Sequence, residues 1–438
     1  MQDLSSLSGD REVEDWLAQG EPHAMAHALN RASSELRTEA MEALADDKAV
    51  RVFGLLEPGN QADILQTVEM ATRQRLLEEM EPDDRARMLS RLPGETSETL
   101  LRELTPGERT MTRTVLGYPE HSAGRIMSPE FVRLTPRMTM AAALDEIRAG
   151  QTRAETVFVM PVADDDMHLL GTVDLSQIVL ADPEMRIADL VTQDVPAVSV
   201  TDDQELVARL MKAADLMIVP VVEETNRLVG IITFDDAMEV LEFEEGEDFA
   251  RTGAAEPVDG SYLSVSVMRL VRARIVWLSL LAVAGTLTVN VLNTFEDTLE
   301  NVVTLALFIP LLIGIGGNAG AQSATTIVRA LAISDVAPKD ALRVAWREAR
   351  TGFVMGLMLA VLAFVILSLI FDQPIALVVA LTLIFICTFA ALIGSLMPLT
   401  ARVFSIDPAV FSAPFVTTIV DTSGLVIYFL VARLVLGV

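Results

Sequence analysis

The chain has 438 residues, a formal net charge of −28 and 51% hydrophobic residues, and its length allows two or three domains. Its charge is uneven: residues 1–260 hold 52 acids and 23 bases, whereas residues 261–438 hold nine acids and ten bases. An acidic soluble part attracts cations and repels nucleic acid, so we expect no nucleic-acid partner. The single cysteine, Cys387, excludes an intrachain disulfide framework and a cysteine-based metal site.

Residues 1–120 have a helical pattern with a repeat. Pro58, Pro82 and Pro106 recur every 24 residues, and each resembles a helix start with proline at the first position and acids close behind. Repeats of this length predict an N-terminal all-α superhelical domain over 1–120. The first residues lack a basic stretch followed by an apolar run, so we expect no cleavable signal peptide and a cytoplasmic N-terminus.

A second internal repeat lies within residues 121–248. VFVMPVADDDMHLLGTVDLSQ and LMIVPVVEETNRLVGIITFDD align at an offset of 59, which pairs Pro161 with Pro220 and Gly171 with Gly230. Strand-forming runs and a helix in each copy predict an α/β pair that resembles tandem CBS domains. In that module an aspartate ending the G-x-x-[ST]-x-x-D tail can bind a ribose. Asp236 fits this position, whereas the first copy has Gln177, which leaves ATP binding open.

Acids concentrate where the second copy ends. Ten acids and one base, Arg251, lie between Asp235 and Asp259. Two interpretations remain open: a solvated linker, or a cation sensor whose carboxylates repel one another until a divalent ion bridges them. The residues concerned share about three turns of a predicted helix: Asp236, Glu239, Glu244, Glu247 and Asp248. Residues 249–274 are then predicted to form an amphipathic connecting helix, which leads into the membrane domain of 275–438.

Five apolar segments of the C-terminal part are long enough to cross a bilayer. They cover 275–293, 302–328, 351–371, 375–400 and 409–436. Arginine and lysine lie before the first segment and in the connections between segments two and three and four and five, and the opposite connections carry only acids. The positive-inside rule therefore predicts a multi-pass protein with a cytoplasmic N-terminus and an external C-terminus.

The second and fifth segments differ from lipid-facing anchors. Small and polar residues share one helical face of the second segment: Gly314, Gly317, Asn318, Ala321 and Thr325. The fifth repeats this pattern with Thr417, Asp421 and Gly424. Simple packing by small residues would explain the glycines. A carboxylate in a membrane span is costly, however, unless it faces protein, water or a cation, so Asp421 favours a cation path.

The donor types of this face indicate which cation passes. A carboxylate, an amide, hydroxyls and backbone carbonyls form a hard oxygen environment that suits Mg²⁺, Ca²⁺ or Mn²⁺ better than Zn²⁺ or Cu⁺. None of the four histidines lies in a predicted span. The sequence shows no nucleophile–base pair, P-loop or thiol–histidine set, so we do not expect an enzyme.

A helical repeat domain, paired CBS modules, a connecting helix and five spans, in that order, resemble the MgtE family of magnesium channels. The most specific segments are PLLIGIGGNAGAQSATT and DPAVFSAPFVTTIVDTSGLVIY. The resemblance implies a homodimer in the bacterial plasma membrane with a pore between the subunits. It implies hydrated Mg²⁺ held at Asp421, with help from positions including Gly314, Gly317, Thr325, Thr417 and Gly424. It also implies Mg²⁺ bound by the five acids listed above, with the connecting helix closing the pore as a plug.

This chain departs from the family pattern at Ala321, where an amide is common. A broader divalent-cation transporter for Mn²⁺ or Co²⁺, or a coupled exporter, is therefore an alternative. A different alternative is a membrane-anchored CBS sensor that binds nucleotide without transport, but such a sensor would need no carboxylate at Asp421.

Overall fold

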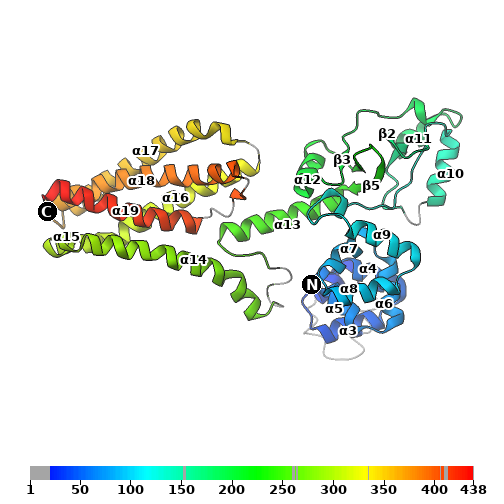
Figure 1. The fold of residues 1–438 in the computed structure, drawn as a ribbon, viewed down its shortest axis with the longest axis horizontal. Coiled ribbons are helices and arrows are strands. Elements are labelled where there is room, and N and C mark those ends of the chain that lie inside the picture. The colour runs from blue at the N-terminus through cyan, green and yellow to red at the C-terminus, as the bar shows by residue number, and fades with distance from the viewer. Residues whose placement is uncertain are drawn as a thin grey trace. The chain divides into compact units, whose positions relative to one another are not determined.

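The computed structural model describes residues 20–150, 154–258, 262, 265–333, 335–404, 406–408 and 413–437 (Figure 1). The chain forms two compact units. The soluble unit comprises Met1–Glu244 and Asp259–Val265, and the membrane unit comprises Glu245–Val258 and Ser266–Val438. The predicted order of helical repeats, an α/β pair and five long apolar helices is present.

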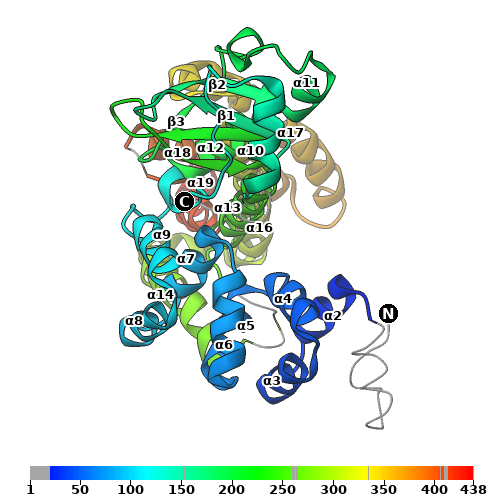
Figure 2. The same cartoon turned by 90° about the vertical axis from the view of Figure 1, so that its right-hand side faces the viewer.

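The first part of the soluble unit is a stack of short helices. They are α2 (Pro22–Leu29), α3 (Ser34–Ala43), α4 (Asp46–Gly54), α5 (Pro58–Thr67), α6 (Met70–Glu79), α7 (Pro82–Ser90), α8 (Gly94–Glu103) and α9 (Pro106–Leu116). The three repeated prolines begin α5, α7 and α9, as predicted. Helices α3 to α9 start every 12 residues, so the 24-residue period spans two helices. Figure 2 shows α5, α7 and α9 succeeding one another along the stack.

A polar residue at the fourth position of alternate helices stabilises this stack. Arg37 donates to the Ala32 carbonyl at 2.9 Å, Gln61 to Phe53 at 2.9 Å and Arg109 to Leu104 at 2.8 Å. Arg85 does the same to the Met80 carbonyl, and it is fully buried beside Glu108. Each donor thus adds a hydrogen bond to a carbonyl at, or just after, the end of the preceding helix.

The two α/β copies follow. The first contains η2 (Ala123–Arg125), α10 (Met140–Gly150), β1 (Val159–Ala163), β2 (Leu169–Asp174) and α11 (Leu175–Leu180). The second contains η3 (Ile187–Asp189), β3 (Val198–Ser199), α12 (Gln204–Ala213), β4 (Ile218–Val222), β5 (Leu228–Thr233) and the start of α13 (Phe234–Thr252). Strands β1–β2 and β4–β5 pair antiparallel in the same register, and β3 adds to β4 in parallel.

The paired glycines of the repeat lie at close backbone contacts. Gly171 has φ +151°, and a Cβ there would lie 2.2 Å from the Thr192 carbonyl oxygen. A Cβ on Gly230 would lie 2.7 Å from the Met127 sulfur. Both positions therefore require glycine, which explains why the two copies share it.

The predicted connecting helix over 249–274 is interrupted in the structure. Helix α13 continues from the second α/β copy to Thr252 and ends at Gly253, and the next helix begins at Val267 after its Ser266 cap. Residues 259–261 and 263–264 of this connection lie outside the described residues. The amphipathic segment after Ser266 does run without a break into the first span.

The membrane unit contains α14 (Val267–Thr294), α15 (Glu296–Asn301), η4 (Val303–Phe308), α16 (Ile309–Ala332), η5 (Pro338–Asp340), α17 (Ala341–Leu367), α18 (Gln373–Val403) and α19 (Ala413–Leu436). Five of these helical segments are long and apolar enough to cross a membrane. Helix α17 starts ten residues before the predicted third span, so Arg343, Arg347 and Arg350 lie on a helix and not in a connecting loop.

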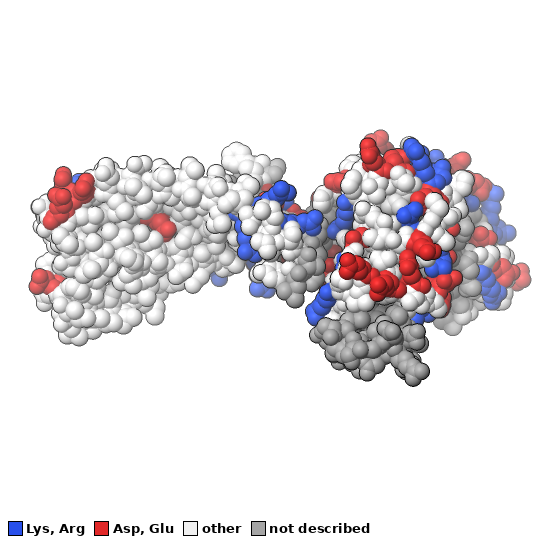
Figure 3. All heavy atoms as spheres, turned by 90° about the horizontal axis from the view of Figure 1, so that it is seen from below, with Lys and Arg blue, Asp and Glu red and all other residues white. Residues whose placement is uncertain are grey.

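Helix α18 is the centre of the membrane unit. It packs against α16, α17 and α19, and α14 packs along α19. Of the 28 residues of α14, only Ala273 is buried, so most of this helix is uncovered in the single chain. The visible face of the unit is uncharged over most of its length, with acids at one end and bases at the other (Figure 3).

Candidate functional site

The membrane carboxylate lies between two packed helices. Asp421 is half-buried on α19, which packs against α16. Its Oδ1 atom is buried and has no hydrogen-bond partner among the described residues. A Cβ on Gly317 of α16 would lie 3.4 Å from this oxygen. A buried acceptor without a donor is costly, so this position suits a cation or a water bound to one.

Gly317 also lies at a close contact between α16 and α19. A Cβ there would lie 2.3 Å from the Thr417 Cγ2 methyl group. The Thr417 hydroxyl donates to the Ala413 carbonyl one turn earlier on α19. The structure therefore brings together three of the predicted residues: Gly317, Thr417 and Asp421.

The other predicted residues of α16 lie on an open face. Gly314, Asn318 and Thr325 are exposed in the single chain, and a Cβ on Gly314 would meet nothing within 4 Å. Ala321 is half-buried on the same side. The residues predicted to share one face of α16 thus fall into two groups: Gly317 is buried against α19, and the others lie on an uncovered face.

Gly424 has a different environment from the one expected. It is buried, and a Cβ there would lie 3.4 Å from the Ile386 side chain of α18. The structure therefore places Gly424 at a helix-packing contact with α18. Gly424 follows Asp421 by three residues, so its Cβ direction differs from that of Asp421 by about 60° around the helix axis. Gly424 therefore faces α18.

The five acids predicted to form a regulatory site lie in separate places. Asp236 accepts a hydrogen bond from Thr233 at 2.6 Å, and burial raises its pKa to about 7. Glu239 pairs with Arg87 of α7, which also pairs with Asp84. The first two of the five acids therefore face the helical stack of the soluble unit.

The remaining three acids have other partners. Glu244 accepts a hydrogen bond from Gln204 of α12 at 2.7 Å, with His121 4.0 Å away. Glu247 pairs with Arg251, whose other nitrogen lies 2.6 Å from Asp407 in the connection between α18 and α19. Asp248 is half-buried next to Glu247.

An acidic cluster beside Asp236 contains residues that sequence reasoning missed. Ligand oxygens of Glu81, Asp83 and Glu155 all lie within 4.8 Å of one another. Asp83 Oδ1 and Glu155 Oε2 are buried and have no hydrogen-bond partner among the described residues. Three converging carboxylates with two unpaired oxygens fit a hard divalent cation.

The pKa values of this cluster reflect its crowding. Burial, with added repulsion from Glu81 and Asp236, raises the pKa of Glu155 to about 8. Burial and the charge of Asp236 raise the pKa of Asp83 well above its usual value. The sequence shows Glu81 and Asp83 on either side of Pro82, whereas Glu155 joins them only through tertiary packing.

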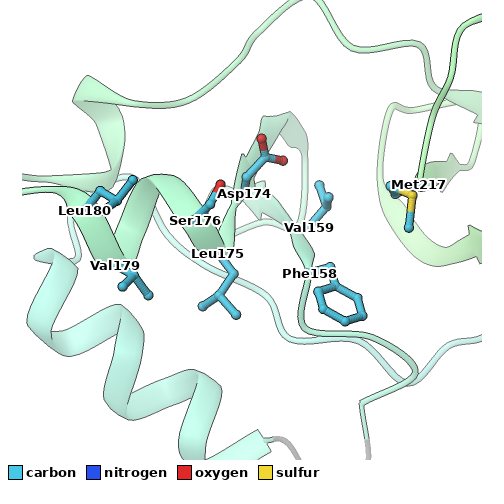
Figure 4. A pocket seen from close by; sticks show the side chains of 8 residues that line it. All are labelled: Phe158, Val159, Asp174, Leu175, Ser176, Val179, Leu180 and Met217. Carbon is cyan, nitrogen blue, oxygen red and sulfur yellow. The ribbon is translucent and has the colours of Figure 1, made fainter.

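The α/β pair contains an open hollow of about 680 Å³. Figure 4 shows Phe158 and Leu175 of the first copy on one side and Met217 of the second on the other, with the Asp174 carboxylate at the rim. Gln177, the residue in place of the expected aspartate, caps α11 by accepting from the Asp174 backbone at 3.0 Å. The first copy thus presents its carboxylate from position 174.

Comparisons with known proteins match each region of the chain. Family models described as MgtE intracellular N domain, CBS domain and MgtE divalent cation transporter match residues 21–121, 123–184 with 187–242, and 309–431. A solved structure of the cytosolic domain of the Mg²⁺ channel MgtE in complex with ATP is similar at a TM-score of 0.51 and 32% identity. It covers 53% of this chain and 95% of that one.

Two curated relatives extend the match over most of the chain. The magnesium transporter MgtE of Thermus thermophilus is 39% identical over 331 residues, covering 75% of this chain and 73% of the relative. That of Bacillus subtilis is 31% identical over 416 residues, covering 94% and 91%. The predicted family and fold class are confirmed, and the relatives are named as transporters. The chain belongs to the MgtE family of magnesium transporters.

Proposed function

We propose that this chain is an Mg²⁺-selective channel whose ion path runs along α16 and α19 of a homodimer. The observation that carries the proposal is the buried Asp421 Oδ1, which faces Gly317 without a donor. Mg²⁺ gives up its waters reluctantly, so Asp421 would hold a hydrated ion. Thr417 on α19 and the open face of Gly314, Asn318 and Thr325 on α16 would line the path.

A second copy would complete this path. The polar face of α16 and most of α14 are uncovered in the single chain, and uncovered intramembrane polar groups require protein or water beside them. In the α/β pair, Leu206 and Leu210 are exposed apolar residues one turn apart on α12 that a second copy would cover. Homodimerisation in the plasma membrane, with the basic ends of the spans inside, follows from the same proposal.

Cytosolic Mg²⁺ would close the channel by binding acids of the soluble unit and α13. Glu81, Asp83 and Glu155 repel one another beside Asp236, and a divalent ion would replace that repulsion with attraction. Glu244, Glu247 and Asp248 would form further contacts along α13. In the absence of Mg²⁺ the acidic surfaces would separate and the gate would loosen.

Two finer points follow from particular residues. Ala321 offers no polar atom to the path, which favours some passage of Mn²⁺ or Co²⁺ beside Mg²⁺. The hollow with Asp174 at its rim supports adenine-nucleotide binding by the CBS pair, as in the similar solved domain that holds ATP.

The test is Mg²⁺ uptake into liposomes that contain the purified chain. We expect uptake with the wild type and a lower half-maximal concentration for Mg²⁺ than for Mn²⁺ or Co²⁺. A protein that binds nucleotide but passes no divalent cation would support the membrane-anchored sensor instead.

A further inference from the structure

Another carboxylate of the membrane unit, Glu348, lies on a helix-packing face of α17. Glu348 is half-buried on α17 and lies at four-residue spacing from Val344 and Gly352, which are both buried. This face of α17 packs against α18, and its other members are apolar or glycine. An acid on such a packing face is costly unless it makes a specific contact.

The contact that Glu348 makes is with the pore-lining helix α16. The hydroxyl of Ser323 lies 2.7 Å from Glu348 Oε2 and 3.0 Å from the Ala391 carbonyl oxygen of α18. Ser323 is only 6% exposed. Its hydroxyl hydrogen therefore lies between two acceptors, which joins α16, α17 and α18 at one point.

The other contacts on this side of α16 are apolar: Ile327, one turn after Ser323, packs with Val344 of α17 and Leu399 of α18. At its closest crossing with α18, a Cβ on Gly394 would lie 2.3 Å from the Gly320 carbonyl oxygen. A crossing of two glycines has no side chain to resist rotation or sliding of the helix. Apolar packing is non-directional, whereas a hydrogen bond is directional, so the Ser323 contact adds a restraint on the rotation of α16 that the apolar contacts do not supply.

Ser323 lies on the opposite side of α16 from the proposed path. At about 100° per residue, it is separated from Asn318 by about 140° and from Thr325 by about 160° around the helix axis. A helix held at Ser323 therefore presents Asn318 and Thr325 toward the open face. Loss of this contact would let these side chains turn away from it.

We propose that Glu348 is a positioning residue for ion passage, which acts through Ser323 to fix the rotation of α16. The inference rests on the proposed path along α16. Glu348 itself does not touch the ion. The property that matters is a hydrogen-bond acceptor at this position, so glutamine should replace glutamate.

The first experiment measures Mg²⁺ uptake into liposomes by Glu348→Ala, Glu348→Gln and Ser323→Ala, with Glu300→Gln as an exposed acidic control. We expect Glu348→Ala and Ser323→Ala to lower uptake about three- to tenfold, as loss of one hydrogen bond allows. The double variant should lose no more than either single one, and Glu348→Gln should retain near-normal uptake. Equal loss in Glu348→Gln and Glu348→Ala would overturn the proposal, because it would assign the effect to charge.

A second experiment reports helix rotation without using transport. A positively charged methanethiosulfonate reagent labels Asn318→Cys, and the native Cys387 is fully buried and provides an unlabelled background. We expect labelling to slow in the Ser323→Ala and Glu348→Ala backgrounds and to recover with Glu348→Gln. Equal labelling in all backgrounds would overturn this inference alone. An unlabelled Asn318→Cys in the otherwise native protein would overturn the assigned path as well.

Discussion

Glu155 offers a quantitative test of the acidic cluster in the soluble unit. Its pKa is raised to about 8 from an ordinary value of 4.5, chiefly by burial. Such a shift corresponds to about 5 kcal/mol at 1.4 kcal/mol per unit. Glu155 is only half-buried, so solvent screening reduces the expected effect to about 2 kcal/mol. Glu155→Gln should therefore stabilise the metal-free protein at pH 8.5 by about this amount.

The sign of the pH dependence follows from proton binding. The folded state binds the proton of Glu155 more tightly than the unfolded state, so this group lowers stability as pH rises from about 4.5 to about 8. We expect the wild type in EDTA to gain thermal stability on acidification from pH 8.5 to 6. Glu155→Gln should gain less, because the substituted residue does not titrate.

The assay is thermal unfolding of the full-length protein in detergent, with and without Mg²⁺. In EDTA at pH 8.5 the first transition should rise by about 4–8 °C in Glu155→Gln. Added Mg²⁺ should stabilise the wild type more than the variant. Glu146→Gln, an exposed acid on α10, is the control and should change neither value. Identical midpoints and identical Mg²⁺ shifts in wild type and Glu155→Gln would refute the cluster as a cation site.

Three further predictions concern the gate and the path. Gly317→Ala should reduce Mg²⁺ uptake at least tenfold, because its Cβ would lie 2.3 Å from Thr417 Cγ2. Gly285→Ala on α14, where a Cβ would meet nothing within 4 Å, should be tolerated, and equal uptake by the two variants would contradict the close contact at Gly317. Arg251→Ala removes the guanidinium that pairs with Glu247 and Asp407 and so leaves both carboxylates open to Mg²⁺. Patch-clamp recording should show closure at about two- to fivefold lower Mg²⁺, and an unchanged closing concentration would argue against a role for this pair. Joint neutralisation of Glu244, Glu247 and Asp248 should leave the channel open at millimolar Mg²⁺, and closure at the wild-type concentration would show that these acids do not sense it.

Much of the architecture was predictable because it depends on short-range sequence repeats. The prolines at 58, 82 and 106 do begin helices, and the 59-residue offset places β1 on β4 and β2 on β5. Helices α4, α6 and α8 were not located from the sequence, because none of them has a proline at its first helical position. The interrupted connection after Thr252 was missed because the acidic and amphipathic stretches were read as one helix across Gly253.

The sites were less predictable because they depend on which helices pack together. Helical spacing placed Gly317 and Asp421 on the polar faces of their helices, but it did not predict that Gly424 would face α18. The five acids of α13 were predicted to form one site because they are close in sequence. In the structure, Asp236 lies beside Asp83, and Glu247 lies beside Arg251. Glu348 was visible in the sequence as an acid, yet its role depends on Ser323, which lies 25 residues away on another helix.

Asp421 is the residue on which the proposed channel depends, and liposome uptake tests it most directly. Wild type and Asp421→Ala would be reconstituted at equal protein content, after gel filtration shows the same oligomeric size. The proposal predicts saturable Mg²⁺ uptake by the wild type and loss of that uptake in Asp421→Ala. Normal uptake by an intact Asp421→Ala protein would contradict an ion path at this carboxylate.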